Sequence, residues 1–244
     1  MGKITIVGMG PGAYEQMTLE AIKCIEECHV IVGYTVYVDL IKEYFKEKEF
    51  ITTPMKKEVD RCKIALERAE QGVDVVMICS GDAGVYGMAG LIYELSPSYE
   101  HVDIRVVSGV TAALSGGAVL GAPLTHDFVV LSLSDLLTPW DLIEKRIHAA
   151  ASGDYSICIY NPSSKKRADY LRQACEIIEQ YQKADLVCGY VRNIGRAQEE
   201  AVVLTLKELK DTQVDMFTTV FIGNSQTRVI NGKMVTPRGY QYEG

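Results

Sequence analysis

Residues 3–13 of the chain read KITIVGMGPGA, an apolar, β-branched run that passes directly into a loop of three glycines and a proline. A short continuous apolar run is typical of a strand that is buried on both faces of a parallel sheet. A glycine loop after such a strand lets backbone groups approach a ligand closely. We therefore expect an α/β fold whose ligands bind beyond the carboxyl ends of its strands.

The same alternation continues through the first half of the chain. Further strands are predicted at residues 29–32, 50–53, 73–79 and 103–107, and helices at residues 18–28, 36–46, 57–71 and 85–95. Thr18 is the expected N-cap of the first helix. Continuous apolar strands separated by amphipathic helices predict a parallel sheet that is covered on both faces.

The second half has a different pattern. Residues 111–121 are small and glycine-rich and precede Pro123, so we place a domain junction there. We expect an N-terminal α/β domain over residues 1–115, carrying the glycine-rich loop, and a C-terminal α/β domain over residues 116–244. Later strands (128–134, 155–160, 186–191, 201–204, 218–222, 228–230) cluster with only two helices (140–151, 165–182), which predicts a mixed sheet. The expected architecture is two αβα domains with the active site in the cleft between them.

Composition excludes several classes of protein. A formal charge of -7 argues against binding of nucleic acid, which needs a basic face. No apolar run approaches the roughly 18 residues that a membrane span needs. The seven cysteines form no C-x-x-C pair, which favours a soluble protein of the reducing cytoplasm. Cys24, Cys28 and His29 are an unconvincing metal site, because the two cysteines lie four apart on an apolar helix stripe. We predict no metal site.

The first glycine loop formally matches a dinucleotide fingerprint, through Gly8, Gly10 and Ala13. Two features disfavour a nicotinamide oxidoreductase. Such a loop leads directly into a helix, yet Pro11 and six further residues precede Thr18. The second strand also ends without the acid that binds ribose hydroxyls. The remaining alternative to a ligand loop is a tight turn that needs glycine at positive φ.

Two further small-residue loops follow predicted strands: residues 80–87, SGDAGVYG, and residues 108–112, SGVTA. Together with residues 8–12, they resemble the motifs of the tetrapyrrole methylase family, although Ala83 stands where many members have proline. Because all three loops follow strands of one parallel sheet, they are expected at the same edge of it. Resemblance to this family implies binding of S-adenosylmethionine, with S-adenosylhomocysteine as product.

Other segments resemble the ring-contracting C17-methyltransferase subgroup of that family, which acts on precorrin-3B or cobalt-factor III in cobalamin biosynthesis. These segments are GYTVY (33–37), LTHDF (124–128), SLSDLLTPW (132–140), YNP (160–162), GNS (223–225) and RGY (238–240). The resemblance spans nearly the whole chain. It implies methylation at carbon 17 with ring contraction, a small-molecule tetrapyrrole as the binding partner, and a homodimer.

The resemblance also implies a set of cofactor contacts. In the first domain they are Gly10, Pro11, Gly81, Asp82, Val85, Tyr86, Thr111 and Ala112, and in the second domain Tyr160, Arg192 and Thr219. Two of these residues have an alternative structural interpretation. Asp82 is also suited to cap a turn, and Thr111 to cap a helix.

Ring contraction requires proton transfer, for which the motifs offer His126, Tyr34, Thr35, Ser134 and Asp135, with Asp127 and Ser132 beside them. Histidine is the residue type best suited to general acid–base chemistry near neutral pH, which favours His126, although a hydrogen bond at the domain junction is an equal alternative. Ser132 and Ser134 alternate on a predicted strand and hence share a face.

A polycarboxylate substrate is unexpected for a chain of net charge -7 unless cations are concentrated locally. Candidate groups are Lys56, Lys57 and Arg61, and Lys165, Lys166 and Arg167; further candidates are Arg192, Arg196, Arg228 and Arg238. The alternative for both lysine groups is a solvated helix start.

Two rival functions remain besides the oxidoreductase. A methylase acting at another ring carbon is disfavoured by residues 132–140, and a non-catalytic tetrapyrrole carrier leaves the three loops unexplained. The short stand-alone chain resembles members of the anaerobic route, which favours cobalt-factor III. Cobalt then enters only as part of the substrate.

Overall fold

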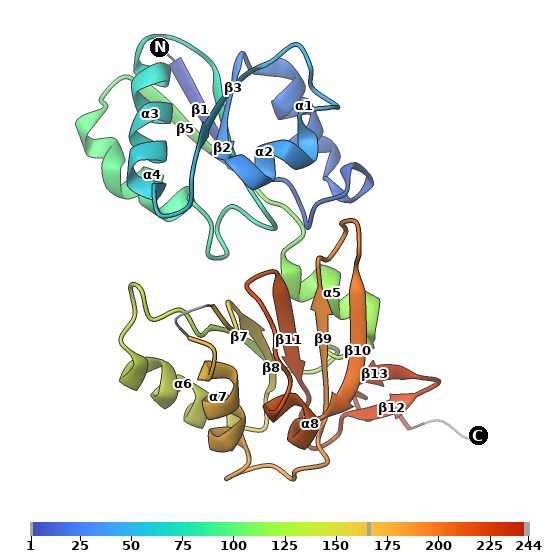
Figure 1. The fold of residues 1–244 in the computed structure, drawn as a ribbon. Helices are drawn as coiled ribbons and strands as arrows, with labels where there is room; N and C mark the ends of the chain where they lie inside the picture. Colours follow the sequence, from blue (N-terminus) through green and yellow to red (C-terminus); the bar gives the residue numbers. More distant parts are fainter. Residues whose placement is uncertain (1, 165–166, 242–244) are drawn as a thin grey trace. The chain divides into compact units, whose positions relative to one another are not determined.

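The computed structural model describes residues 2–164 and 167–241 and divides into two compact units, Met1–Ala112 and Ala113–Gly244. Unit 1 is built on a five-stranded sheet, whose strands run between helices in Figure 1. Its strands are β1 (Gly2–Gly8), β2 (Val30–Tyr34), β3 (Glu49–Thr53), β4 (Val75–Cys79) and β5 (Val102–Val107), in the order β3-β2-β4-β1-β5. Every pairing is parallel, as predicted, so all five strands end at one edge.

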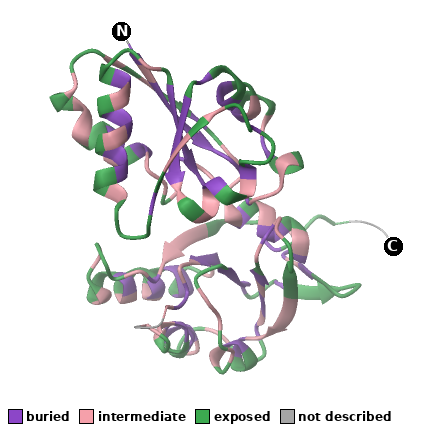
Figure 2. Cartoon of the chain, turned by 45° about the horizontal axis from the view of Figure 1, so that its top comes forward, coloured by how far each residue is buried: buried purple, intermediate pink, exposed green. Residues whose placement is uncertain are grey.

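Helices cover both faces of this sheet. One face packs against α1 (Leu19–Glu27) and α2 (Thr35–Ile41), and the other against α3 (Glu58–Glu70) and α4 (Ala89–Leu95). Figure 2 shows the consequence in the burial colours, with buried strands and helices exposed on their outer faces. The predicted N-cap is confirmed: the Thr18 hydroxyl accepts a hydrogen bond from the Ala21 backbone at 3.1 Å.

Two predicted helices of unit 1 are shorter than expected. α2 ends at Ile41 rather than residue 46, because the chain then turns to bury Phe45 and to stack Tyr44 on Tyr14, with ring centroids 4.7 Å apart. Tyr14 belongs to the short 3₁₀ turn η1 (Tyr14–Gln16) that follows the glycine loop. α4 begins at Ala89 rather than residue 85, because residues 80–88 form a loop.

Unit 2 contains a five-stranded mixed sheet, as predicted. Its strands are β7 (Phe128–Ser132), β8 (Ser156–Tyr160), β9 (Val187–Arg192), β10 (Glu200–Thr205) and β11 (Thr218–Ile222), in the order β10-β9-β11-β8-β7. Only β7 and β8 are parallel to each other. A small second sheet joins β12 (Arg228–Ile230), β13 (Lys233–Val235) and β6 (Gly121–Ala122).

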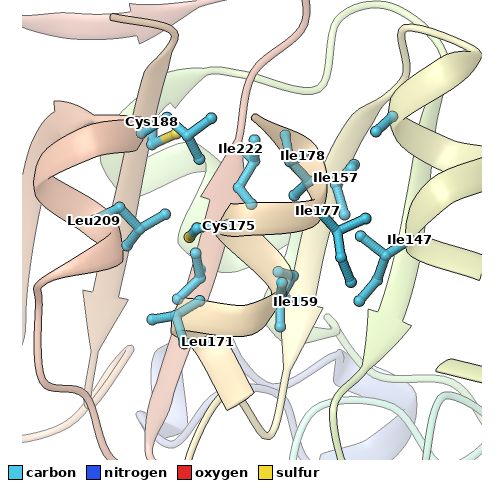
Figure 3. Packing of buried hydrophobic residues seen from close by; sticks show 14 of the residues in the cluster. Ile147, Ile157, Ile159, Leu171, Cys175, Ile177, Ile178, Cys188, Leu209 and Ile222 are labelled. Atoms are coloured by element: carbon cyan, nitrogen blue, oxygen red, sulfur yellow. The ribbon is translucent and has the colours of Figure 1, made fainter. Parts of the chain in front are cut away.

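One face of the mixed sheet packs against α6 (Trp140–Ser152), α7 (Tyr170–Ile178) and α8 (Leu206–Lys210). Figure 3 shows the centre of this core, where Leu171 and Cys175 of α7 lie over Ile159 and Ile222 of the sheet. The helix predicted over residues 165–182 is observed only over Tyr170–Ile178, as α7, and Lys165 and Lys166 lie outside the described residues.

The opposite face carries α5 (Ala112–Leu120), a helix that the sequence indicated only through the alternative role of Thr111 as a cap. Its sequence AALSGGAVL was interpreted as a junction because of its glycines. Those glycines allow close packing: a Cβ on Gly116 would lie 2.9 Å from side-chain atoms of both Ile194 and Phe221. Residues 112–120 therefore form a helix that buries one face, with Ala113, Gly116, Gly117 and Leu120. Among the described residues, no helix is long and apolar enough to span a membrane.

Candidate functional site

The first two glycine loops are joined backbone to backbone at the carboxyl edge of the unit 1 sheet. Gly10 donates to the Gly81 carbonyl at 3.0 Å, and Gly81 donates back to the Gly10 carbonyl at 2.7 Å. Both glycines have positive φ, 71° and 69° respectively, which favours glycine at these positions. The tight-turn interpretation of the first loop and its convergence with the second are therefore compatible.

Asp82 connects the second loop to the third. Its Oδ1 accepts hydrogen bonds from the backbone of Gly84 (2.7 Å) and Val85 (3.0 Å), and its Oδ2 accepts one from Gly109 (2.9 Å). The carboxylate thus caps its own turn and holds residues 108–111 beside residues 80–87. This is the turn-capping role that the sequence left open.

Gly8 completes the junction of the three loops. A Cβ placed on Gly8 would lie 2.6 Å from the Gly109 nitrogen and 2.7 Å from the Gly81 oxygen, so the three backbones are in direct contact. A side chain at position 8 is thereby excluded from the junction. At the glycines of this junction, backbone N–H and C=O groups can approach a ligand without an intervening side chain.

The other candidates of unit 1 lie on the same loops. Val85 and Tyr86 are in the second loop rather than on a helix, with Tyr86 in left-handed backbone (φ 53°) and exposed. Thr111 and Ala112 are half-buried, and a Cβ on Gly81 would contact the Thr111 backbone at 3.5 Å. Pro11 is buried directly after Gly10.

In unit 2 a row of hydroxyl side chains crosses one end of the sheet. Ser132 and Tyr160 are paired at the carboxyl ends of β7 and β8. The register that pairs Val220 with Ile159 places Thr219 of β11 beside Tyr160. Alternation along the strands directs all three side chains to the α5 face. There the Tyr160 hydroxyl accepts a hydrogen bond from the Ala113 backbone, in the first turn of α5, at 2.7 Å.

Arg192 does not join this row. It is paired with Thr218 and therefore belongs to the face opposite Thr219. Its guanidinium forms an ion pair with Asp215 at 2.8 Å and lines a cavity of about 230 Å³ with Tyr190, Glu200 and Asp215. The structure thus brings Tyr160 and Thr219 together and separates Arg192 from both.

Asp135 is held in a small polar network just beyond β7. Its carboxylate accepts a hydrogen bond from the Tyr170 hydroxyl at 2.8 Å and forms an ion pair with Arg167 at 3.5 Å. The hydrogen bond to Asp135 raises the pKa of Tyr170. Arg167 also donates to the Leu133 carbonyl at 3.0 Å. The segment after β7 is therefore fixed by residues that follow β8.

β7 ends at Ser132, two residues earlier than the predicted end of this strand. Ser134 therefore lies beyond the strand and does not alternate with Ser132 on it. The two serines are nevertheless neighbours. Ser132 Oγ accepts hydrogen bonds from the Ser134 backbone (3.2 Å) and from the Asn161 amide (3.0 Å). Ser132, Ser134 and Asp135 all lie at the carboxyl edge of β7.

His126 lies at the other end of that strand. Ser156, the first residue of β8, donates its backbone N–H to the Asp127 carbonyl at 3.2 Å, which places residues 126 and 127 at the amino edge. The His126 side chain is 47% exposed, and its Nδ1 accepts a hydrogen bond from the Asp127 backbone. Four strand steps, about 13 Å, separate Phe128 from Ser132. The structure therefore does not bring His126 together with Ser134 and Asp135.

Tyr34 and Thr35 lie where β2 passes into α2. The Thr35 hydroxyl donates to the Thr53 carbonyl at the end of β3, at 3.3 Å. The Tyr34 ring contacts Tyr37 edge-on at 5.1 Å and lies 5.8 Å from the Arg61 guanidinium carbon. Both candidates therefore occupy the same sheet edge as the glycine loops.

The candidate cations differ in their surroundings. Lys56 and Lys57 are exposed, as a solvated helix start predicts, and Lys57 pairs with Asp60 at 2.9 Å. Arg61 is buried, contrary to that interpretation. Arg167 pairs with Asp135, Arg196 contacts the Phe217 ring, and Arg228 and Arg238 are exposed.

Cys24 and Cys28 are buried in the helix core, and burial raises the pKa of Cys28 to about 11, whereas His29 is exposed. The described residues contain no group of three side chains suited to a metal ion.

Three residues of the site were not singled out from the sequence: Gly109, which contacts Gly8; Thr53, which contacts Thr35 and Arg61; and Tyr170, which contacts Asp135. Gly109 had a usable signal, since it belongs to the third loop. Thr53 and Tyr170 had none, because their roles depend on tertiary contacts.

Comparisons with known proteins agree with this geometry. A family model described as Tetrapyrrole (Corrin/Porphyrin) Methylases matches residues 3–210. A probable cobalt-factor III C(17)-methyltransferase of Salmonella typhimurium is 44% identical, over 97% of this chain and 99% of that protein. A precorrin-3B C(17)-methyltransferase of a Sinorhizobium species is 36% identical, over 98% of this chain and 97% of that protein. The crystal structure of the methyltransferase CobJ has a TM-score of 0.90 and 34% identity, and covers 97% of this chain and 100% of that one. The chain belongs to the tetrapyrrole (corrin/porphyrin) methylase family.

Proposed function

We propose that this protein catalyses the S-adenosylmethionine-dependent methylation of cobalt-factor III at carbon 17, with ring contraction, in cobalamin biosynthesis. The observation that carries the proposal is full-length similarity to proteins named for this reaction, on a fold that joins three small-residue loops at one edge. Identity is higher to the relative named for cobalt-factor III (44%) than to the one named for precorrin-3B (36%), which favours the cobalt substrate.

The loop junction of unit 1 fits the proposed cofactor. Bound there, S-adenosylmethionine would supply an electrophilic methyl group for in-line displacement, a reaction that depends mainly on positioning. Gly10, Pro11, Gly81, Val85, Tyr86, Thr111 and Ala112 are the proposed contacts in unit 1. Asp82 contributes by holding two loops together, since its carboxylate already accepts three backbone hydrogen bonds.

In unit 2, Tyr160 and Thr219 are the stronger candidates for cofactor contact, because both lie on the α5 face of the mixed sheet and at the same edge of it. Arg192 remains a proposed contact, although its ion pair with Asp215 would have to open or turn. For proton transfer during contraction we retain Tyr34, Thr35, Ser134 and Asp135 ahead of His126, which lies at the other end of β7 from Ser134 and Asp135. Ser134 and Asp135 are favoured by their position beside Ser132 and Tyr160.

We also infer a cytoplasmic homodimer. Seven buried, unpaired cysteines support a reducing compartment. Resemblance to the family supports the dimer. Light scattering should give about twice the chain mass of 27.0 kDa; a monomer would contradict this part of the proposal.

Calorimetry tests the cofactor site. Wild-type protein should bind S-adenosylhomocysteine at about one site per chain. Asp82→Asn should weaken this binding by roughly 10- to 100-fold, since the amide retains only one acceptor oxygen and releases a charge-assisted contact to Gly84, Val85 or Gly109. Asp103→Asn, on an exposed position of β5, is the matched control and should bind normally.

Turnover tests the reaction. Cobalt-factor III and precorrin-3B should each be incubated with the methyl donor, with the added methyl group followed by mass and contraction by the absorption spectrum. Binding of S-adenosylhomocysteine without turnover of either substrate would refute the proposed reaction and leave the cofactor site standing.

A further inference from the structure

Two arginines on one face of α3 have opposite surroundings. Arg61 and Arg68 are seven residues apart, two helical turns, and both reach strand β3. Arg68 contacts Glu49, the first residue of β3, and forms an ion pair with it. Arg61 contacts Thr53, the last residue of β3, through a hydrogen bond from Nε to Oγ1 at 2.8 Å.

Stability alone would favour a carboxylate partner for the buried arginine, but it is the more exposed arginine that has one. The Arg68 side chain is 35% exposed and has a carboxylate partner. Arg61 is only 4% exposed, yet no carboxylate lies within ion-pair distance of it anywhere in residues 2–164 and 167–241. A buried charge without a counter-charge is costly. Arg61 therefore has a requirement for an anion that the described part of the chain does not meet.

The hydrogen bonds of Arg61 define what is missing. Besides Thr53, the guanidinium donates from Nη2 to the Pro54 carbonyl at 3.2 Å and from Nη1 to the weak acceptor Met88 Sδ at 4.0 Å. A guanidinium has five N–H groups. One N–H on each terminal nitrogen therefore has no acceptor among the described residues. Two N–H groups on adjacent nitrogens are the number that one carboxylate takes in a bidentate contact.

The position of Arg61 fits a substrate group rather than a structural anion. Thr53 and Tyr34 end β3 and β2, and Met88 ends the second glycine loop, so Arg61 lies at the sheet edge where parallel sheets bind ligands. It also lies 5.8 Å from the ring of Tyr34, a proposed catalytic residue. Arg68 lies at the opposite edge, where no candidate site residue is found among those described.

We propose that Arg61 binds a carboxylate of the tetrapyrrole substrate through its two free N–H groups, beside Tyr34. The inference rests on the proposed function and adds the residue that recognises the substrate's charge. It also accounts for a chain of net charge -7 that binds a polyanion: one buried guanidinium in a site of low dielectric attracts a carboxylate more strongly than exposed lysines do.

Substrate kinetics of Arg61→Met, Arg61→Lys and Arg68→Met test the proposal. Arg61→Met should raise KM for the corrinoid by about 10- to 100-fold through loss of a charge-assisted bidentate contact. Arg61→Lys should give an intermediate KM, because lysine keeps the positive charge but lacks the two N–H groups that make the bidentate contact. Arg68→Met should leave KM near the wild-type value, and S-adenosylhomocysteine affinity should be unchanged in all three.

Thermal unfolding without substrate provides the second measurement. Because methionine removes an unpaired buried charge, Arg61→Met should melt no lower than wild type. An unchanged corrinoid KM in Arg61→Met, or in Arg61→Lys if the methionine variant does not fold, would overturn the inference. An equal loss of cofactor affinity would also overturn it, since Arg61 would then only support the second loop. Wild-type protein without turnover would refute the proposed function itself, and with it this inference.

Discussion

Asp135 and His126 are nine residues apart in the sequence and lie at opposite ends of β7. Asp135 is oriented by Tyr170 and Arg167, whereas His126 is half exposed and accepts a hydrogen bond from the backbone of the adjacent Asp127. A group that transfers a proton must be held within hydrogen-bonding reach of the reacting atom. Orientation and position therefore favour Asp135, although ordinary titration behaviour favours histidine.

The two residues should differ in their effect on ring contraction. Asp135→Asn is expected to slow contraction by about 10²–10⁴-fold, the usual loss for a general acid or base, while methyl transfer continues. His126→Ala should leave both steps close to wild type. Mass spectrometry follows the methyl group, and the absorption spectrum of the corrinoid follows contraction.

Asp127→Asn is the matched control for a charge change at the amino edge of β7. If His126→Ala accumulates a methylated, uncontracted product while Asp135→Asn does not, the assignment reverses. Melting temperatures of both variants separate loss of chemistry from loss of the loop that Asp135 helps to fix.

The helix α5 shows how packing can override helix propensity. Gly116 and Gly117 are adjacent, and both are buried. A Cβ on Gly116 would meet Ile194 and Phe221 atoms at 2.9 Å, whereas a Cβ on Gly117 would lie 3.5 Å from Leu124, an ordinary contact. The first glycine is required by the sheet beneath it, and the second is not.

Alanine substitutions should therefore change stability in opposite directions. Gly117→Ala should stabilise unit 2 by about 0.5–1 kcal/mol through helix propensity. Gly116→Ala should destabilise it by about 1–3 kcal/mol through overpacking. Urea unfolding followed by the fluorescence of Trp140, the single tryptophan, reports on unit 2. Stabilisation by both substitutions would contradict this prediction and would show that the Phe221 and Ile194 side chains move aside to accommodate a Cβ on residue 116 at little cost in free energy.

Sequence patterns predicted the elements whose signal is local. β11 and β12 match their predicted bounds, and α3 and α6 differ by a residue at most, because β-branched runs and amphipathic periods survive in any context. The misses have tertiary causes. α5 was hidden by glycines that serve packing, and the early ends of α2 and β7 follow from contacts of Phe45 and Arg167 with distant residues.

The site shows the same division. Loops that follow parallel strands were correctly placed at one edge, since the topology of the sheet dictates it. Side-chain roles were less accessible. The sequence gives no sign that Arg61 is buried without an acid, or that Arg192 and Thr219 belong to opposite faces of their sheet. Those facts depend on which segments pack together.

Cysteine burial is distributed over the whole molecule, with Cys24, Cys28, Cys62 and Cys79 in unit 1 and Cys158, Cys175 and Cys188 in unit 2. Burial raises the pKa of Cys79 to about 11 and of Cys62 to about 12. An unfolded thiol ionises near 9.0, so their contribution to stability is complete below pH 9 and is lost as the pH rises towards 11 to 12.

When native protein is treated with a thiol reagent at pH 7.5, almost none of its cysteines should be labelled. In guanidinium, all seven cysteines should be labelled. Peptide mapping of briefly heated samples should show labels confined to one unit if that unit opens first. Rapid labelling of any cysteine in the native protein would mean that its region opens locally.

An alkylated thiol does not revert when the protein refolds. In the presence of the reagent, each cysteine therefore keeps a permanent mark of the first opening in which it reacted, whereas fluorescence or absorption reports only the present state. With four such cysteines in one unit and three in the other, a sample stored with the reagent records which regions of the chain have opened.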